Sequence, residues 1–249
     1  MSTRIPPLLE PYLLLPRETS LTLLTSVLGA STNWLVVRYL SSLLNPSSSS
    51  SSASHATPSS SPSASVLLVS FLRDYPFFRD LSLKQGLDLD AAGRKGRLAF
   101  VDGLSSLYLP PPVGTEKTAA WLSNLTSPRL EDVRRVLLDA VESLKRTAGT
   151  GEGKVVLVID GLDALIATAS DEEGVGQKLQ ELLLDLREQT HHTILTLSAD
   201  APLVSNQTTR LEKEHAALVL SQAHGADVVL SLRLLDTGTA KDVSGVLIE

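Results

Sequence analysis

The stretch KVVLVIDGLDAL, from Lys154 to Leu165, decides the fold. Five consecutive apolar residues, Val155 to Ile159, lead directly into Asp160 and Gly161. A short, β-branched, all-apolar run is typical of a strand that is buried on both faces of a parallel sheet. In folds that hydrolyse nucleoside triphosphates, an aspartate at the carboxyl end of such a strand holds the magnesium ion that bridges the phosphates. The stretch therefore raises the question of whether a phosphate-binding loop accompanies Asp160.

The segment that would have to form this loop does not fit the pattern. A phosphate-binding loop reads GxxxxGK[ST], because its backbone N–H groups curl round phosphate while its lysine neutralises charge. In the corresponding segment Leu24 takes the place of the first glycine and Ala30 that of the lysine, so only Gly29 and Ser31 fit. Without the lysine the charge of a triphosphate would be uncompensated. We predict that the chain binds no nucleotide cofactor and hydrolyses no ATP by itself. Asp160 would then only accept backbone hydrogen bonds at the end of its strand.

Apolar runs alternate with amphipathic segments along most of the chain. Ser31 or Thr32 is expected to begin a helix with Trp34 on its buried side, Asp74 a second, and Ser127-Pro128 a third. Further helices are expected around residues 179–186 and 217–222. The predicted strands cover residues 21–27, 66–71, 98–101, 155–159, 193–197, 228–235 and 243–248. This order predicts an α/β fold of three layers: a mainly parallel central sheet, helices on both faces, and an antiparallel hairpin at the C-terminal edge.

Two segments differ in composition from this pattern. Residues 1–18 contain four prolines and are predicted to form an N-terminal arm, with residues 19–249 forming a single domain. Residues 46–65 consist almost entirely of serine, proline and alanine. Such a segment cannot bury enough apolar surface to offset the entropy lost on ordering, so we predict a disordered insertion.

Composition and side-chain spacing exclude several kinds of site. The chain has no cysteine, and its five histidines lack the spacing of a zinc site, so no metal site is predicted. His191 and His192 are expected at a helix end, where a cation favours the helix dipole. Asp74, Asp102 and Asp163 lie at or near strand ends like Asp160, where aspartate usually caps a turn or helix. A net charge of −6 argues against wholesale wrapping of nucleic acid, and polar residues interrupt the apolar segment 21–44, so no membrane span is expected.

Three segments together resemble the sixth subunit of the Elongator complex: FLRDYPFF at 71–78, LAFVDGLSSLY at 98–108 and VVLVIDGLDAL at 155–165. The resemblance covers most of residues 20–248. It implies a RecA-like fold that has lost its phosphate-binding loop. It also implies a six-membered ring with the fourth and fifth Elongator subunits, two copies of each. Such a ring binds tRNA and serves the larger complex that modifies wobble uridines, whose chemistry lies in another subunit.

Further expectations follow from the resemblance. The chain would be no enzyme, and any ATPase activity would belong to the assembled ring. RecA-like rings hold nucleic acid with the loops at 167–176 and 198–214, which makes Arg210 and Lys213 the candidates for tRNA contact. The partner surface would include residues 110–113 and the terminal strands. The expected location is the cytoplasm, with the nucleus as a second location. Two alternatives stay open: a nucleotide-dependent enzyme of the RecA family, and a recombination-mediator paralogue that binds single-stranded DNA.

Overall fold

The computed structural model describes residues 6–45, 64–109, 119–147, 153–168, 174–235 and 245–249. Within this part of the chain one sheet contains eight strands in the order β4-β3-β2-β5-β6-β1-β7-β8. The strands are β1 (Ser20–Ser26), β2 (Ser65–Ser70), β3 (Leu98–Asp102), β4 (Leu122–Asn124), β5 (Val155–Asp160), β6 (His192–Ser198), β7 (Val228–Arg233) and β8 (Val246–Ile248). Every neighbouring pair is parallel except β7 and β8.

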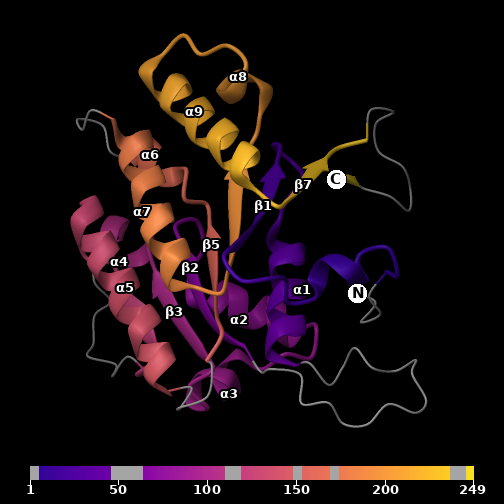
Figure 1. Cartoon of the computed structure of the whole chain (residues 1–249), viewed down its shortest axis with the longest axis vertical. Coiled ribbons are helices and arrows are strands. Elements are labelled where there is room, and N and C mark those ends of the chain that lie inside the picture. Colours follow the sequence, from indigo (N-terminus) through magenta and orange to yellow (C-terminus); the bar gives the residue numbers. More distant parts are fainter. Residues whose placement is uncertain (1–5, 46–63, 110–118, 148–152, 169–173, 236–244) are drawn as a thin grey trace.

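Helices cover both faces of the sheet (Figure 1). The longer ones, α5, α7 and α9, pack on one face, whereas η1, α1 and α2 pack on the other. Their bounds are η1 (Glu10–Leu13), α1 (Asn33–Leu44), α2 (Tyr75–Leu83), α3 (Leu89–Arg94), α4 (Ser105–Tyr108), α5 (Leu130–Thr147), α6 (Ala164–Thr168), α7 (Val175–Gln189), α8 (Ala201–Val204) and α9 (Arg210–Gly225). The predicted three-layer α/β fold with an antiparallel C-terminal edge is confirmed.

Strand β5 shows why its sequence is apolar throughout. Successive side chains of a strand point to opposite faces. Leu157 and Ile159 accordingly belong to the core under α5 and α7, while Val156 and Val158 belong to the core under α1 and α2. All four are fully buried. A strand in the middle of a sheet that is covered on both sides has no solvent-facing position.

The topology brings the carboxyl ends of three strands together. Strand β6 lies between β1 and β5, and Ser26 pairs with Ser198 at their carboxyl ends. On the other side of β5, Asp160 pairs with Ser70 of β2. The loop after β1 therefore lies one strand away from Asp160, at the same edge of the sheet. Ligands of open α/β sheets bind at this edge.

Several boundaries differ from the sequence-based predictions. Ala64 and Ser65 are predicted to belong to the disordered insertion, but both are buried, and Ser65 begins β2, where it pairs with Val155. Trp34 was expected on the buried side of α1, yet it is an exposed side chain at the helix start. The helix expected around residues 217–222 is part of α9, which begins at Arg210 because Thr209 and Glu212 form a capping box there. Helix α3 and strand β4 were not predicted.

Some predictions lie outside the described residues. These are the disorder at residues 46–63, the loop at 110–113, residues 169–173 of the loop at 167–176, and the connection between the two strands of the C-terminal hairpin. The side chain of Arg97 bridges the residues on either side of the serine-rich segment. The Arg97 guanidinium donates hydrogen bonds to the carbonyls of Leu43 and Leu44, at the end of α1, and to that of Ala64, before β2. Arg97 thus holds both ends at one place.

The residues before β1 pack against the domain. Leu9 and Leu13 are buried in the core under α1, and the Leu13 carbonyl accepts a hydrogen bond from Ser42 of that helix. The Tyr12 hydroxyl donates to the Glu249 carboxylate, so this segment also contacts the other end of the chain. Among the described residues, no helix is both long and apolar enough to span a membrane.

Candidate functional site

The loop after β1 is the segment that was compared with a phosphate-binding loop, and two of its N–H groups already have acceptors. Leu28 N donates to the Asp200 carboxylate at 2.8 Å, and Ala30 N donates to the Val27 carbonyl at 2.9 Å. Gly29 between them adopts a φ of +91°, which closes this tight turn. Leu24 is not in the loop at all: it is a fully buried residue of β1. The N–H groups of Leu28 and Ala30 are therefore not free to bind a phosphate group.

Asp160 is buried, with 2% of its surface exposed, and is held by two hydroxyl groups. Ser70 Oγ donates to Asp160 Oδ2 at 2.9 Å, and Thr196 Oγ1 donates to Asp160 Oδ1 at 3.1 Å. The prediction of backbone donors is wrong: both donors among the described residues are hydroxyls, and the N–H of the next residue, Gly161, donates to Thr196 Oγ1 at 2.8 Å. Burial raises the pKa of Asp160, and the two hydrogen bonds and Arg73 oppose that rise. The Asp160 carboxylate thus links three adjacent strands, β2, β5 and β6, by side-chain hydrogen bonds.

Asp163, one turn further along the chain, has a different environment. Its Oδ2 accepts a hydrogen bond from Ser198 N at 3.2 Å and lies 4.0 Å from His215 Nδ1. His215 is buried, and its Nε2 contacts the Ser198 carbonyl at 2.8 Å. Asp163 Oδ1 is buried and has no hydrogen-bond partner among the described residues. One oxygen of the Asp163 carboxylate is therefore hydrogen-bonded and the other is not, at the point where α6, β6 and α9 meet.

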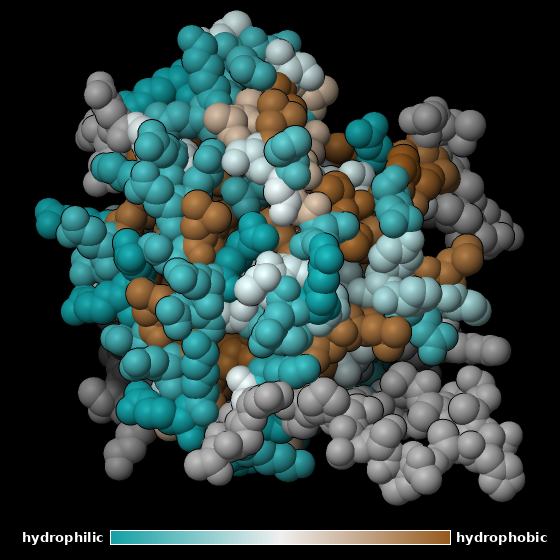
Figure 2. Space-filling view, in the orientation of Figure 1, coloured by the Kyte–Doolittle hydropathy of each residue, from teal (hydrophilic) through white to brown (hydrophobic). Residues whose placement is uncertain are grey.

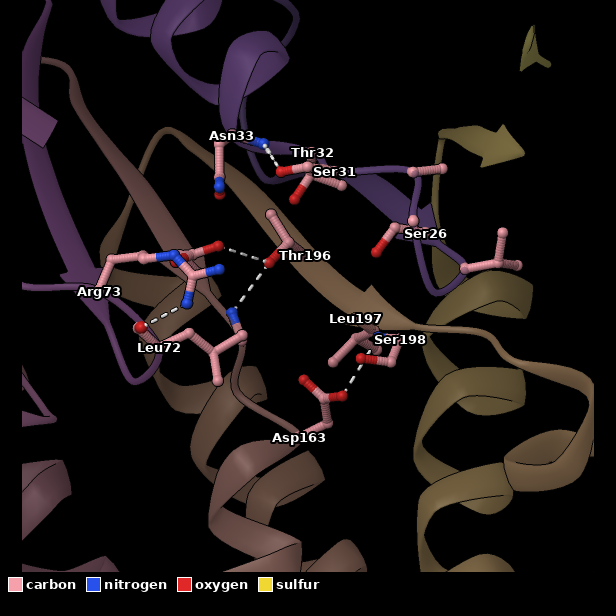
Figure 3. Close-up of a pocket in the computed structure, with 15 residues that line it drawn as sticks. Ser26, Ser31, Thr32, Asn33, Leu72, Arg73, Asp163, Thr196, Leu197 and Ser198 are labelled. Atoms are coloured by element: carbon pink, nitrogen blue, oxygen red, sulfur yellow. Dashed lines mark hydrogen bonds between the residues drawn. The ribbon is translucent and has the colours of Figure 1, made fainter. Parts of the chain in front are cut away.

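These groups surround a cavity of about 250 Å³ at the carboxyl edge of the sheet (Figure 3). The loop after β1 closes one side, and Leu72 and Arg73, which follow β2, close another. Arg73 lies near Asp160. Among the described residues, Arg73 forms no ion pair with Asp160 or Asp163, the two aspartates that line the cavity. Its guanidinium donates to the Leu72 carbonyl at 2.7 Å and lies 5.4 Å from the Phe77 ring centre. The cavity combines two carboxylates, one guanidinium and several hydroxyls.

The remaining strand-end aspartates act as caps, as predicted. Asp74 accepts a hydrogen bond from Phe77 N at the start of α2. Asp102 accepts from the N–H groups of Leu104 and Ser105 and from the Ser105 hydroxyl. Neither lines the cavity. Within the described ranges no group of three or more histidine or acidic side chains could hold a metal ion.

The comparisons with known proteins identify the family. The model of the family described as Elongation complex protein 6 matches residues 61–248, which include Asp160 and most of the sheet. The chain belongs to this family. Members of the Elongation complex protein 6 family are Elongator subunits, as the three resembling segments implied. No curated protein matches the sequence.

Solved structures support the same fold. A KaiC-like protein from the hyperthermophilic archaeon Pyrococcus horikoshii OT3 superposes with a TM-score of 0.58 at 16% sequence identity. The alignment covers 92% of this chain and 76% of the archaeal one. At this identity the likeness concerns the fold alone, which is RecA-like. The cavity beside Asp160 lies at the carboxyl edge of the sheet, where open α/β folds in general bind ligands.

The two residues predicted to contact tRNA lie on helix α9 of this Elongation complex protein 6 family member, not in a loop. Arg210 and Lys213 occupy the first turn of that helix and are exposed. Arg210 Nε donates to Glu214 Oε1 at 2.9 Å, and Glu214 also accepts from Gly176 N at the start of α7. The sequence Thr209-Arg-Leu-Glu212 carries the capping-box signature that would have placed the helix start here.

Sequence reasoning missed the side chains that hold Asp160. Ser70 and Thr196 each lie one residue before the end of a predicted strand, so parallel pairing would have placed their hydroxyls beside Asp160. His191 and His192 were expected as cations at a helix end. Instead His192 begins β6 and is buried, with Nδ1 at 2.8 Å from Ser20 Oγ. Burial lowers the pKa of His192 to about 4.

Proposed function

We propose that this chain is a non-catalytic Elongator subunit. It forms a hetero-hexameric ring with the fourth and fifth Elongator subunits, two copies of each, and this ring binds tRNA and supports modification of the wobble uridine. The observation that carries the proposal is the family match over residues 61–248 on a RecA-like fold. The chemistry of the modification belongs to another subunit, and the ring supplies the tRNA.

The geometry of the cavity supports a non-catalytic role. Ala30 stands where a phosphate-binding lysine would be, and Leu28 N and Ala30 N already have acceptors. The two oxygens of Asp160 accept hydroxyl hydrogens from neighbouring strands, which leaves this carboxylate poorly placed to hold magnesium. Any ATPase activity would therefore belong to the assembled ring. ATP binding by the isolated chain at micromolar concentration, abolished by Asp160→Ala, would contradict the proposal and favour a nucleotide-dependent enzyme.

The test of the complex is affinity purification of the tagged chain from its native cell, followed by mass spectrometry. The expected result is recovery of two other RecA-like chains together with the large Elongator subunits. Recovery of recombinases would instead favour the recombination-mediator alternative, which binds single-stranded DNA. The expected location in the cytoplasm, with the nucleus as a second site, is tested by imaging the same tagged chain.

The tRNA contact is tested in the assembled ring. We propose that Arg210 and Lys213 contact the phosphate backbone. Arg210→Gln with Lys213→Gln is preferable to charge reversal, because a glutamate at 210 would repel Glu214, which also holds Gly176 N. The expected result is weaker tRNA binding and a shallower dependence of affinity on salt, since about one counterion is released per phosphate contact. Unchanged affinity and salt dependence would exclude these two residues.

A matched control uses cations elsewhere on the surface. Arg134 and Arg135 of α5 are exposed and pair with Asp185 and Asp132. Replacing both by glutamine removes the same charge from a helix far from α9 in the chain. If this control weakened tRNA binding as much as the α9 variant, the effect would reflect net charge rather than a contact.

A further inference from the structure

Basic side chains gather at the amino edge of the sheet, opposite the edge that carries Asp160. Lys154 directly precedes β5, and its carbonyl accepts a hydrogen bond at 2.9 Å from Ser65 N, at the start of the neighbouring β2. The ends of α3 and α5 lie beside each other at the bottom of Figure 1, where a Cβ added to Gly96 would meet Thr147 Cγ2 at 2.2 Å. Each helix precedes a strand, so both ends lie at the same edge as Lys154. The residues of this amino-edge cluster are Lys95, Lys145, Arg146 and Lys154.

The charges of the amino-edge cluster are not neutralised within the described part of the chain. On the same helix, nearer its start, Arg134 pairs with an aspartate at 2.7 Å. By contrast, Lys145 contacts only a glutamine amide oxygen and Arg146 only a main-chain carbonyl. The side chains of Lys95 and Lys154 have no polar partner among the described residues. A chain with a net charge of −6 therefore carries a patch of unpaired positive charge.

Helix dipoles explain part of this arrangement. A cation in the last turn of a helix favours the dipole, which accounts for Lys145 and Arg146. Lys95 follows the last residue of α3 and can act in the same way. Lys154 precedes a strand and has no such role. Since like charges repel each other, an anion bound at the cluster would relieve a repulsion that the free chain retains.

The cluster extends beyond a cavity of about 650 Å³ at this edge. Lys145 and Lys154 line the cavity, and so do the exposed acids Glu18 and Glu188, so the charges within it balance. The excess positive charge lies outside it, at the ends of α3 and α5. A ligand that contacts all four cations must therefore reach from the cavity across both helix ends. A chain of phosphates fits this requirement, whereas one small anion does not.

The surface around the cluster favours a nucleic acid over a protein as the ligand. Among the described residues of α3 and α5, no large apolar side chain is exposed. Figure 2 shows mainly hydrophilic residues over the lower part of α5. Protein interfaces have an apolar centre and are depleted in lysine, whereas lysine and arginine alone are enough to hold a phosphate backbone.

We propose that the amino-edge cluster binds the phosphate backbone of tRNA. The inference rests on the proposed function, which supplies the RNA. Arg210 and Lys213 begin a helix that follows β6, at the carboxyl edge, so the two sets of cations contact different phosphate groups. Contacts to phosphate carry no base sequence, so the cluster binds tRNAs of different sequence equally well.

The experiment uses the chain assembled with its two RecA-like partner subunits. Lys95→Gln, Lys145→Gln and Lys154→Gln are combined in one amino-edge variant, whose substitutions leave the apolar core untouched. Fluorescence anisotropy of labelled tRNA is measured at several salt concentrations. The slope of log affinity against log salt should become shallower by about 2–3, because each phosphate contact contributes about 0.7–0.9. Between about 50 and 200 mM salt, the affinity of the variant should fall about 20- to 40-fold less than that of wild type.

A matched control removes the same charge from cations that are already paired. Arg79, Arg134 and Arg135 each form an ion pair with an aspartate. Replacing these three by glutamine should leave both the affinity for tRNA and its salt dependence close to wild type. If the control variant changed as much as the amino-edge variant, the effect would reflect net charge and the cluster would be excluded.

The outcomes separate this inference from the proposed function. If the assembled wild-type ring does not bind tRNA, the proposed function fails. If the ring binds tRNA and the amino-edge variant binds it with unchanged affinity and slope, the proposed function stands and the cluster is wrong. If the variant no longer assembles while wild type does, the cluster contacts an acidic surface of a partner protein instead.

A footprint on the wild-type ring tests the cluster without any substitution. Bound tRNA should slow the acetylation of Lys95 and Lys154 by acetic anhydride, measured by mass spectrometry, and high salt should abolish this protection because the contacts are electrostatic. Protection of Lys213 alone would place the RNA at the carboxyl edge only and would overturn the inference.

Discussion

Ser70 donates its hydroxyl hydrogen to Asp160 at 2.9 Å, across two neighbouring strands at their carboxyl ends. Thr196 does the same from the opposite side at 3.1 Å, so β2, β5 and β6 are joined by one row of side chains. Ser70 and Thr196 are themselves buried. Asp160 is therefore the centre of a row of hydrogen-bonded side chains at the carboxyl edge of the sheet.

Asp160→Asn should change how stability depends on pH. Burial raises the pKa of Asp160 in the folded chain above its ordinary value of 3.8, so the folded state binds its proton more tightly than the unfolded state. Asp160 therefore favours the folded state at low pH, and this contribution is lost as pH rises from about 3.8 through the raised pKa. Urea unfolding at several pH values should show wild type losing stability relative to Asp160→Asn over that window. Parallel curves would contradict this account.

His192 should make the chain sensitive to acid. Its pKa is lowered from 6.5 to about 4 by burial, so the unfolded chain binds more protons than the folded one between these values. Stability from the neutral histidine is present above pH 6.5 and is lost as pH falls towards 4, by at most about 3 kcal/mol. His192→Gln should flatten the unfolding free energy in this window. His224→Gln, at an exposed position, should retain the wild-type slope.

Replacing Gly161 by alanine should lower the unfolding free energy more than the same change at Gly86. It adopts a φ of +70°, and a Cβ added there would lie 2.4 Å from Leu72 Cγ. Gly86 has a similar φ of +80° but no atom within 4 Å of the added Cβ. Gly86→Ala should therefore cost only the left-handed strain of about 1–2 kcal/mol, whereas Gly161→Ala adds a clash of about 1–3 kcal/mol. Chemical denaturation of both variants measures the difference, and equal losses would show that Leu72 simply moves aside.

Arg97 should be worth more than an ordinary surface arginine. Its guanidinium satisfies the carbonyls of Leu43, Leu44 and Ala64, and Arg97→Met would leave them without this donor. We expect a loss of about 1–3 kcal/mol in unfolding free energy. Arg94→Met is the control, because Arg94 is exposed and its nearest acid lies 3.9 Å away, so the expected change is below about 0.5 kcal/mol. Similar losses for both variants would contradict a special role for Arg97.

Deletion of residues 46–63 should leave the fold intact. Since Arg97 binds carbonyls on both sides of this segment, a short glycine-serine linker can join the described ends. Loop closure depends only weakly on length, at about 0.6 kcal/mol per doubling, so stability should stay within about 1 kcal/mol of wild type or rise slightly. The melting temperature of the deletion variant checks this, and a cooperative transition lost altogether would show that the segment contributes to the core.

The sequence predicted the sheet well where a strand is buried on both faces. The runs around Val156 and Leu67 contain no polar interruption, and that pattern is typical of a strand in a covered parallel sheet. It predicted less where short polar signals decide. Asp88 caps α3 by accepting a hydrogen bond from Ala91 N, yet that signal is one side chain in a polar stretch.

The candidate site was predictable only in part. The substitution of Ala30 for lysine and the position of Asp160 follow from the spacing of motifs along the chain. The unpaired oxygen of Asp163 does not, because it depends on Ser198 and His215, which reach Asp163 from β6 and α9. Likewise, no pattern shows that Arg73 is occupied by Leu72 and Phe77. These contacts are set by packing between elements that are distant in sequence.

The contacts of Arg97 hold together the two ends of the segment 46–63 without the peptide chain between them. The piece before the segment contributes β1, which pairs with β6 on one side and β7 on the other, and α1, whose buried face lies against the sheet. A protease that cuts within the serine-rich stretch would therefore release nothing. Two fragments would remain associated through a central strand, and the nick would become visible only after denaturation.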